Sequence, residues 1–427
     1  MGNQCSQLTH LPEVKRLMKI NPPLHEFIEE ECPLVNRAIG SCDARIKSAV
    51  LNEFNRILPK RHFESINELL LYIEQKRIQR IDFLASVSAP RFERLPEIKF
   101  PCVPIKIGDK ILMTFLDSGC GMSSMTRIAA YKLGFSSHIN PAVKGLATGF
   151  GNNVNIVGVL PNVNVQFGDI VFLATFVVID KAVADFIIIG ADFMMKHRIK
   201  LDFKTAEVVF PRKVIEEKAF KFMPPLKNAA VAAEFIVSML ENVNVPRTLG
   251  FLPDIVNQRN VFVDAKINEI QVQVMIDSGA ESSMMSRKAA SHLRLFKYTD
   301  LRKSRISSGL GPVVVIGKIP PVPIEFDSHT ILFMPFDVLY GVEFELIILG
   351  SDFLTWYGCQ IDFDSKRLNI RLDSLKSYAM HQCKCEKQEW LRSTGLGSLF
   401  GAETGETDAN ETSEIRLDSL NAVTISL

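Results

Sequence analysis

The chain has 427 residues, of which 47% are hydrophobic and 23% are charged, as is typical of a soluble globular protein. This length exceeds what one ordinary hydrophobic core supports, so we expect two or three domains. The 49 Lys and Arg residues and the 48 Asp and Glu residues leave a formal net charge of +1. A global basic field that would hold nucleic acid is therefore excluded.

The eight cysteines are spread thinly along the chain, which favours reduced thiols in the cytoplasm over a disulfide framework. Cys383 and Cys385 form half of a zinc-ligand pattern, but no second pair accompanies them. We therefore expect neither a metal nor a cofactor. No run of about 18 apolar residues predicts a membrane-spanning helix, and we expect no secretory signal.

The first six residues, Met1-Gly2-Asn3-Gln4-Cys5-Ser6, fit the pattern for N-myristoylation of Gly2 after removal of Met1. One acyl chain binds membranes only marginally, and Cys5 is the candidate for a second, palmitoyl anchor. The alternative is a chance match to a short pattern. We predict a lipid-anchored protein on the cytoplasmic face of a membrane.

Residues 1–95 are prone to form helices. The apolar spacing in Leu51-Phe54-Ile57-Leu58 and in Ile66-Leu69-Leu70-Tyr72-Ile73 predicts amphipathic helices there. We expect a small helical N-terminal region that also carries the lipidation motif.

Four patterns occur twice in the chain, in the same order. The two copies of each pattern are separated by the same number of residues as Asp117 and Asp277, and this separation is called the offset below. Two of them are short motifs, Asp117-Ser118-Gly119 with Asp277-Ser278-Gly279 and Gly149-Phe150-Gly151 with Gly309-Leu310-Gly311. The other two are an apolar run, at 187–193 and 347–353, and the tripeptides at 201–203 and 361–363. Four ordered matches at one offset predict two copies of one domain, repeat one at 98–212 and repeat two at 258–373.

Each repeat has the pattern of a small β domain. Strands at 103–107 and 110–116 flank the turn Gly108-Asp109, and strands at 261–267 and 271–276 flank Asn268-Glu269. Helical stretches are expected at 123–133 and 282–293, with further strands after them. The predicted fold is mainly β, with two tandem closed β domains.

The remaining segments differ in character. Residues 213–257 are expected to be an ordered connector with a helical piece at 229–240. Residues 374–427 lose apolar periodicity and become acidic, so most of this tail is expected to be disordered.

The two Asp-Ser-Gly motifs are the candidate catalytic elements. Each Asp follows an apolar strand, the Ser can hydrogen-bond backbone groups and hold the carboxylate, and the Gly permits a sharp turn and close approach of another segment. A solvated turn aspartate is the alternative, but it does not explain why the flanking patterns are duplicated in order.

These residues resemble those of the retroviral-type, or retropepsin-like, aspartic proteases, and more closely the DNA-damage-inducible aspartic protease family of ubiquitin shuttles. The matching segments in repeat two are Asp277-Ser278-Gly279-Ala280-Glu281, Ser308-Gly309-Leu310-Gly311 and Ile348-Leu349-Gly350-Ser351-Asp352-Phe353-Leu354. In repeat one they are Asp117, Gly149-Phe150-Gly151 and Ile189-Gly190-Ala191-Asp192-Phe193. Less specifically, Asn21-Pro22-Pro23-Leu24 and Arg77-Ile78-Gln79-Arg80-Ile81 look like parts of that family's helical domain.

The resemblance implies partners in the ubiquitin pathway, but the chain departs from the family pattern. The family has one protease fold per chain and forms homodimers, whereas this chain holds two folds. We expect neither a ubiquitin-like domain nor a compact ubiquitin-binding module. Cys120-Gly121 in repeat one stands where repeat two has Ala280-Glu281, so repeat one is expected to be the weaker half.

An aspartic protease needs two carboxylates about 3 Å apart that share one proton. One repeat supplies one Asp, and the connector of about 50 residues lets the chain fold back on itself. We expect an intramolecular pseudo-dimer in which Asp117 and Asp277 meet, supported by the Ser and Gly residues after each. Pairing of each repeat with its twin in another chain stays open, so the protein is a monomer with an internal pseudo-dimer or a homodimer.

Gly149-Phe150-Gly151 and Gly309-Leu310-Gly311 are predicted to be flap tips over an extended peptide. Asp192, Asp352, Asp202 and Asp362 are assigned structural roles, such as helix capping after Gly190 and Gly350. Cys120 is expected to be a packed, unreactive thiol.

The sequence thus predicts an aspartic endopeptidase that cleaves protein or peptide substrates with a water activated between Asp117 and Asp277. The alternative is a peptide-binding or scaffold protein that keeps the fold with weak or no turnover.

Overall fold

The computed structural model describes residues 21–40, 44–58, 61–92, 97–142, 144–149, 152–180, 186–210, 218–221, 261–308, 312–342, 344–372, 375–382 and 424–426. The chain divides into two compact units. The first unit comprises Met1–Ile98, Asp264–Val274 and Glu281–Trp356. The second comprises Lys99–Val263, Met275–Ala280 and Tyr357–Leu427. The Asp-Ser-Gly motif of repeat two therefore belongs to the same unit as the whole of repeat one.

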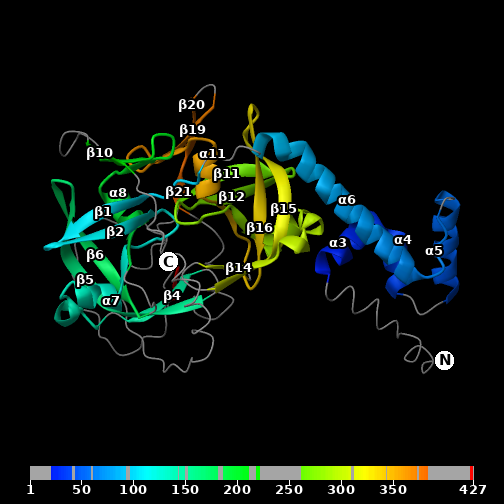
Figure 1. Cartoon of the computed structure of the whole chain (residues 1–427), viewed down its shortest axis with the longest axis horizontal. Helices are drawn as coiled ribbons and strands as arrows, with labels where there is room; N and C mark the ends of the chain where they lie inside the picture. The colour runs from blue at the N-terminus through cyan, green and yellow to red at the C-terminus, as the bar shows by residue number, and fades with distance from the viewer. Residues whose placement is uncertain are drawn as a thin grey trace, which may run out of the picture. The chain divides into compact units, whose positions relative to one another are not determined.

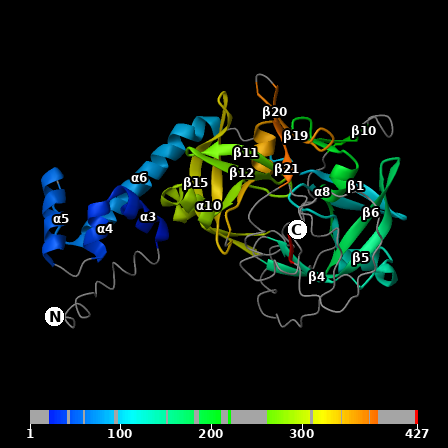
Figure 2. The same cartoon turned by 180° about the vertical axis from the view of Figure 1, so that it is seen from behind.

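A helical region opens the first unit, as predicted (Figures 1 and 2). Its helices are α3 (Pro22–Glu31), α4 (Pro33–Gly40), α5 (Ala44–Ile57) and α6 (Ile66–Phe92). Helix α3 begins at Pro22 because the Asn21 side chain caps it, accepting a hydrogen bond from the Leu24 amide at 3.1 Å. The centre of the helical region's core is formed by the buried residues Leu24, Ile28, Leu69 and Leu70.

Repeat one folds into a closed sheet within the second unit. Six strands form the ring: β1 (Cys102–Ile107), β2 (Lys110–Asp117), β7 (Ile187–Gly190), β3 (Ser124–Thr126), β6 (Ile170–Ile179) and β5 (Asn152–Phe167). Pairing of β1 with β5 at Lys106 and Gln166 closes it. β4 (Gly145–Gly149) and β22 (Thr424–Ser426) extend the sheet, and β4 pairs with β5 and β22.

Repeat two builds the same ring from β15 (Pro312–Asp327), β16 (Thr330–Leu339), β13 (Met284–Ser286), β17 (Ile347–Leu349), β12 (Ile270–Ile276) and β11 (Val261–Ile267). Pairing of β11 with β15, at Lys266 opposite Glu325, closes it. β14 (Arg305–Ser308) and β21 (His381–Gln382) extend this sheet. The prediction of two tandem closed β domains after a helical region is confirmed.

The helical stretches predicted at 123–133 and 282–293 are partly wrong. Each begins as a strand, β3 or β13, and the helices α7 (Arg127–Lys132) and α10 (Arg287–His292) follow. The Thr126 and Ser286 side chains cap these helices, each accepting from an amide three residues later at 3.1 Å. Because a capping residue has extended backbone, the residues before it continue as strands.

A third sheet joins the ends of both repeats within the second unit. Its strands, in order, are β10 (Lys218–Lys221), β9 (Glu207–Phe210), β8 (Lys200–Asp202), β18 (Gln360–Asp362), β19 (Arg367–Arg371) and β20 (Leu375–Ala379). β8 of repeat one pairs antiparallel with β18 of repeat two, with Leu201 opposite Ile361. Short helices α8 (Ala191–Lys196) and α11 (Ser351–Trp356) and the 3-10 turns Ser136–His138, Phe296–Tyr298 and Leu301–Lys303 complete the described elements.

Candidate active site

The structure brings Asp117 and Asp277 together within the second unit. Asp117 is the last residue of β2, and Asp277 follows β12 directly. The strands end there because the chain turns: the amides of Gly119 and Cys120 donate to Asp117 Oδ1 at 2.9 and 3.1 Å. The amides of Gly279 and Ala280 donate to Asp277 Oδ1 at 2.9 and 3.0 Å. Each carboxylate is thus held by its own turn.

The two carboxyl groups hydrogen-bond each other. Burial raises the pKa of Asp117, and burial together with the Asp117 charge raises the pKa of Asp277 well above its ordinary value. Two poorly solvated carboxyls in contact do not readily ionise together, so the pair shares one proton.

The serines of the two motifs are interlocked. The Ser118 hydroxyl donates to the carbonyl of Ile276 at 2.8 Å and accepts from the Ser278 amide at 2.9 Å. The Ser278 hydroxyl donates to the carbonyl of Leu116 at 2.7 Å and accepts from the Ser118 amide at 2.9 Å. Both serines are fully buried. Four bonds therefore fix the two turns against each other.

The glycines of the motifs leave no space for a side chain. A Cβ atom at Gly119 would clash with the Asp277 carboxyl, and one at Gly279 would clash with the Asp117 carboxyl. The carboxyl of one repeat thus lies directly against the glycine of the other.

Ion pairs in the third sheet join the repeats beyond the two aspartates. The Asp202 carboxylate of β8 accepts hydrogen bonds from both terminal nitrogens of Arg371 of β19, at 2.9 and 2.5 Å. Lys200 of β8 lies 3.1 Å from Asp362 of β18. These contacts link repeat one to repeat two with opposite charges at each position.

Comparison with known protein families decides the relationship. The model of the family described as aspartyl protease matches residues 92–202 and 253–362, together more than half of the chain. The chain belongs to the aspartyl protease family. Each of the two matched stretches contains one of the Asp-Ser-Gly motifs.

Curated relatives of this chain include DNA damage-inducible proteins, which confirms the resemblance predicted from the motifs. That of Neurospora crassa is 26% identical over 163 residues, covering 36% of this chain and 36% of its own. That of Chaetomium globosum is 30% identical over 113 residues, covering 26% and 24%. Protein DNA-DAMAGE INDUCIBLE 1 of Arabidopsis thaliana is 29% identical over 112 residues, covering 26% of each chain. The match spans about a quarter to a third of these relatives' length.

A solved structure is also similar, the retroviral protease-like domain of Ddi1 from Leishmania major. It is 24% identical, with a TM-score of 0.26, and the similarity covers 29% of this chain and 94% of that domain.

Two further Ser–Asp pairs support the loops that follow the two Asp-Ser-Gly motifs. Asp192 Oδ1 accepts from the amide and hydroxyl of Ser123, both at 2.8 Å. Asp352 accepts from the Ser283 amide at 2.9 Å and hydroxyl at 2.7 Å, and burial raises the pKa of Asp352 to about 6. Asp192 thus has the structural role expected of it, although its bonds go to Ser123, and it lies in the first turn of α8 after Gly190. Sequence reasoning missed both serines, although they too recur at the offset of the catalytic motifs.

Cys120 is fully buried next to Asp117. Its thiol donates to the Met122 carbonyl at 2.9 Å, and burial and the Asp117 charge raise its pKa well above the ordinary value. A thiol that stays protonated is a poor nucleophile, as the sequence predicted.

Other predicted residues lie outside the described part of the chain: the flap residues Phe150, Gly151, Gly309, Leu310 and Gly311, the lipidation residues Gly2 and Cys5, and Cys383 and Cys385. Gly149 is described and ends β4. Within the described residues, no helix has both the length and the apolar character to cross a membrane. The flap roles and the lipid anchor stay predictions.

Proposed function

We propose that this aspartyl protease is an active endopeptidase in which Asp117 and Asp277 form the catalytic pair. The observation that carries the proposal is the placement of the two carboxyl groups, each against the glycine of the other motif and both with raised pKa. Structural aspartates are normally paired with cations or amides. Two carboxyls placed against each other in a buried site are costly for folding and useful for acid–base chemistry.

The two carboxyls of the resting enzyme share one proton. Among the described hydrogen bonds, each carboxyl accepts from two backbone amides of its own turn, those of Gly119 and Cys120 for Asp117 and those of Gly279 and Ala280 for Asp277. Amide donors stabilise the charged form of a carboxyl group. Since the amide donors are balanced and the Asp117 charge raises the pKa of Asp277, we write the reaction with Asp117 as the ionised member and general base.

The reaction follows from this assignment. Asp117 takes a proton from a water molecule as the water oxygen attacks the scissile carbonyl carbon, and Asp277 gives its proton to the carbonyl oxygen. The tetrahedral intermediate then breaks its C–N bond. Asp117 returns its proton to the amine, and a hydroxyl proton of the intermediate restores Asp277. The products are a carboxylic acid and an amine, and the pair is as it began.

Pairing of repeat one with repeat two within one chain is favoured over pairing of identical repeats. Linkage of the two repeats in one chain raises their effective concentration relative to pairing between chains.

The test is cleavage of a peptide library by the full chain and by Asp117→Asn, Asp277→Asn and the double variant. We expect each single variant to lose activity by about a thousandfold or more, because either loss removes the shared pair. Unchanged cleavage by the double variant would exclude catalysis by this pair and leave the alternative of a peptide-binding protein. The single variants also separate the pairing modes, since identical-repeat pairing would leave each single variant with one intact site.

Protein substrates, ubiquitin-pathway partners and membrane attachment through Gly2 and Cys5 remain parts of the proposal supported by the sequence pattern and family resemblance. Incorporation of a myristate analogue into the wild-type chain but not into Gly2→Ala is the expected result for the anchor.

A further inference from the structure

A fully buried arginine ties the helical region to repeat two within the first unit. Arg77 of α6 donates from Nε and Nη2 to the Glu74 carboxylate at 2.6 and 2.7 Å. Its Nη1 donates to the main-chain carbonyls of Lys297 and Thr299 at 3.0 and 2.9 Å. Glu74 also accepts from the Asn21 side chain at 2.9 Å. A buried guanidinium that satisfies two carbonyls of another element is a specific contact, since losing it would strand those carbonyls.

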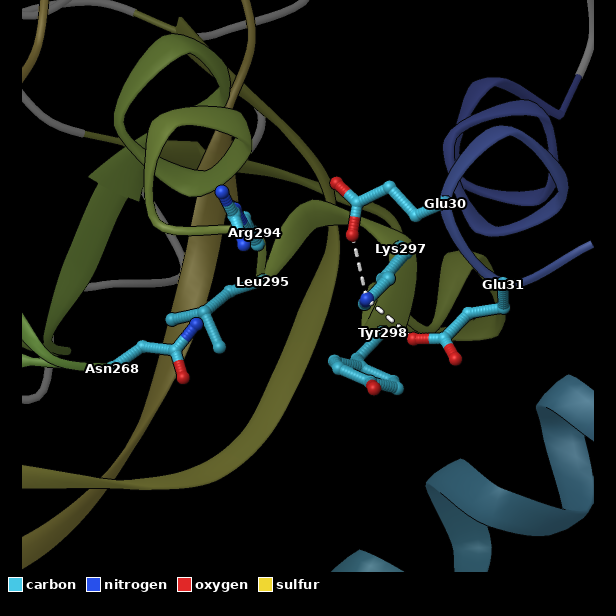
Figure 3. A pocket seen from close by; sticks show the side chains of 7 residues that line it. All are labelled: Glu30, Glu31, Asn268, Arg294, Leu295, Lys297 and Tyr298. Carbon is cyan, nitrogen blue, oxygen red and sulfur yellow. Dashed lines mark hydrogen bonds and ion pairs between the residues drawn. The ribbon is translucent and has the colours of Figure 1, made fainter. Parts of the chain in front are cut away.

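Charged contacts surround this arginine. The Lys297 ammonium lies between Glu30 and Glu31 of α3, at 2.6 Å from each (Figure 3). The same three side chains line a cavity of about 630 Å³ together with Asn268, Arg294, Leu295 and Tyr298. Further along α6, Asp82 pairs with Arg302 at 2.5 Å. The helical region therefore holds the whole segment 297–302.

This segment leads into β14, whose first residue, the exposed Arg305, pairs with a buried carboxylate. Arg305 donates from Nη1 to Asp337 Oδ1 of β16 at 3.0 Å and from Nη2 to the other carboxylate oxygen. Asp337 is fully buried, and its carboxylate also accepts from the Ser282 hydroxyl at 2.7 Å. Ser282 is five residues after Asp277 in the chain. Polar contacts and one short stretch of chain thus connect α6 to the loop that follows the second catalytic motif.

Repeat one has none of these side chains. At the corresponding positions of repeat one, Gly145 stands for Arg305, Val177 for Asp337 and Met122 for Ser282. Val177 is buried and apolar. The network is therefore a property of repeat two, not a requirement of the fold.

We propose that Arg77 and the Arg305–Asp337 pair are positioning residues for the catalytic loop of repeat two, so that the helical region controls turnover. The inference rests on the proposed function. Arg77 holds segment 297–302 in place, and this segment sets the position of Arg305 at the start of β14. Arg305 binds Asp337, and Asp337 binds Ser282, which follows the catalytic Asp277 in the chain. A displacement at Asp277 acts mainly on the chemical step, because both carboxyls must stay within reach of one water.

The experiment compares the full chain with Arg77→Met, Arg77→Lys, Arg305→Met and the double variant Arg77→Met/Arg305→Met. Arg56→Met is the matched control, because Arg56 is an exposed arginine of the same region that pairs only with Glu53 among the described contacts. Peptide cleavage gives kcat and KM, and hydrogen exchange reports the amides of 300–308 and 282–286. Arg77→Lys keeps the charge without the planar fork and is the milder variant where Arg77→Met does not fold.

We expect Arg77→Met and Arg305→Met each to lower kcat by about fivefold or more with little change in KM, and the double variant to lose less than the product of the two. Amides of 300–308 should exchange faster in both Arg77 variants and not in Arg56→Met. Folded Arg77 variants with wild-type kcat and wild-type exchange would overturn the proposal. If the wild type cleaves nothing, the proposed function fails, and the exchange of 282–286 in Arg77→Met still decides whether the network reaches that loop.

Discussion

Ser118 and Ser278 hold each other's backbone: each hydroxyl donates to a strand carbonyl of the other repeat and accepts the other serine's amide. Removing one hydroxyl leaves a buried amide and a buried carbonyl without their partner. An unsatisfied buried polar group costs about 1–3 kcal/mol. The two serines therefore stabilise the pairing of the repeats as well as the site.

We predict that Ser118→Ala and Ser278→Ala each lower the free energy of unfolding by about 2 kcal/mol. Urea denaturation followed by fluorescence measures this change. Ser86→Ala is the control, since that exposed hydroxyl bonds only a carbonyl of its own helix among the described contacts. Equal stability of the three variants would show that the exchanged bonds do not hold the repeats together.

The glycines of the two motifs give a second prediction. Gly119→Ala and Gly279→Ala should abolish cleavage, because the new methyl group clashes with the carboxyl of the opposite repeat. Gly108→Asn is the matched control: Gly108 has a φ of 62°, no described atom lies within 4 Å of its Cβ position, and repeat two has Asn268 there with a φ of 49°. An active Gly119→Ala enzyme would mean that the carboxyls are not held against the turns.

Much of this architecture was predictable because the constant offset made each repeat a check on the other. The strand and turn around Gly108, the two closed sheets and the meeting of two turns followed from that duplication. The short strands β3 and β13 were not predictable in this way. The local sequence does not distinguish a polar residue that caps a helix from a polar residue within the helix, so the predicted helices began too early. Pairing in three dimensions with β6 and β16 makes them strands.

Residues outside the duplicated patterns were harder to predict. The sequence around Arg77 resembles a family helix, yet nothing in the sequence indicates that Arg77 binds carbonyls 220 and 222 residues later. Arg371 was likewise unpredictable, because its partner Asp202 lies on a strand of the other repeat. Contacts of this kind depend on how sheets meet, which local periodicity does not encode.

The Asp202–Arg371 pair gives a third prediction. Asp202 is buried and accepts both Arg371 nitrogens, so removing either partner leaves a poorly solvated charge. We predict that Asp202→Ala and Arg371→Ala each destabilise the protein, and that a double-mutant cycle gives a coupling of about 1–2 kcal/mol. The exposed pair Arg127–Asp180, at 2.9 Å, is the control and should couple by less than about 1 kcal/mol. If the effects of the Asp202 and Arg371 changes are additive, the two side chains do not stabilise the pairing of the repeats through their contact.

His197 gives the last prediction, a loss of stability in acid. The ring packs against Phe172 and Phe193, with centroids 4.6 and 4.3 Å away, and its Nε2 is buried without a partner among the described residues. Burial, and then the neighbouring Lys196 charge, lowers the pKa of His197 to about 4. In the unfolded chain the pKa is about 6.5.

The unfolded state therefore binds the proton first as pH falls, and stability from His197, complete above about pH 6.5, declines towards pH 4. The loss is at most about 3 kcal/mol, because one pKa unit corresponds to about 1.36 kcal/mol. Unfolding free energies from pH 7 to 4.5 measure it, with His197→Tyr, which introduces the residue of repeat two at position 357, as the variant without this slope. Identical pH slopes in the two proteins would show that His197 is protonated equally in the folded and unfolded chains.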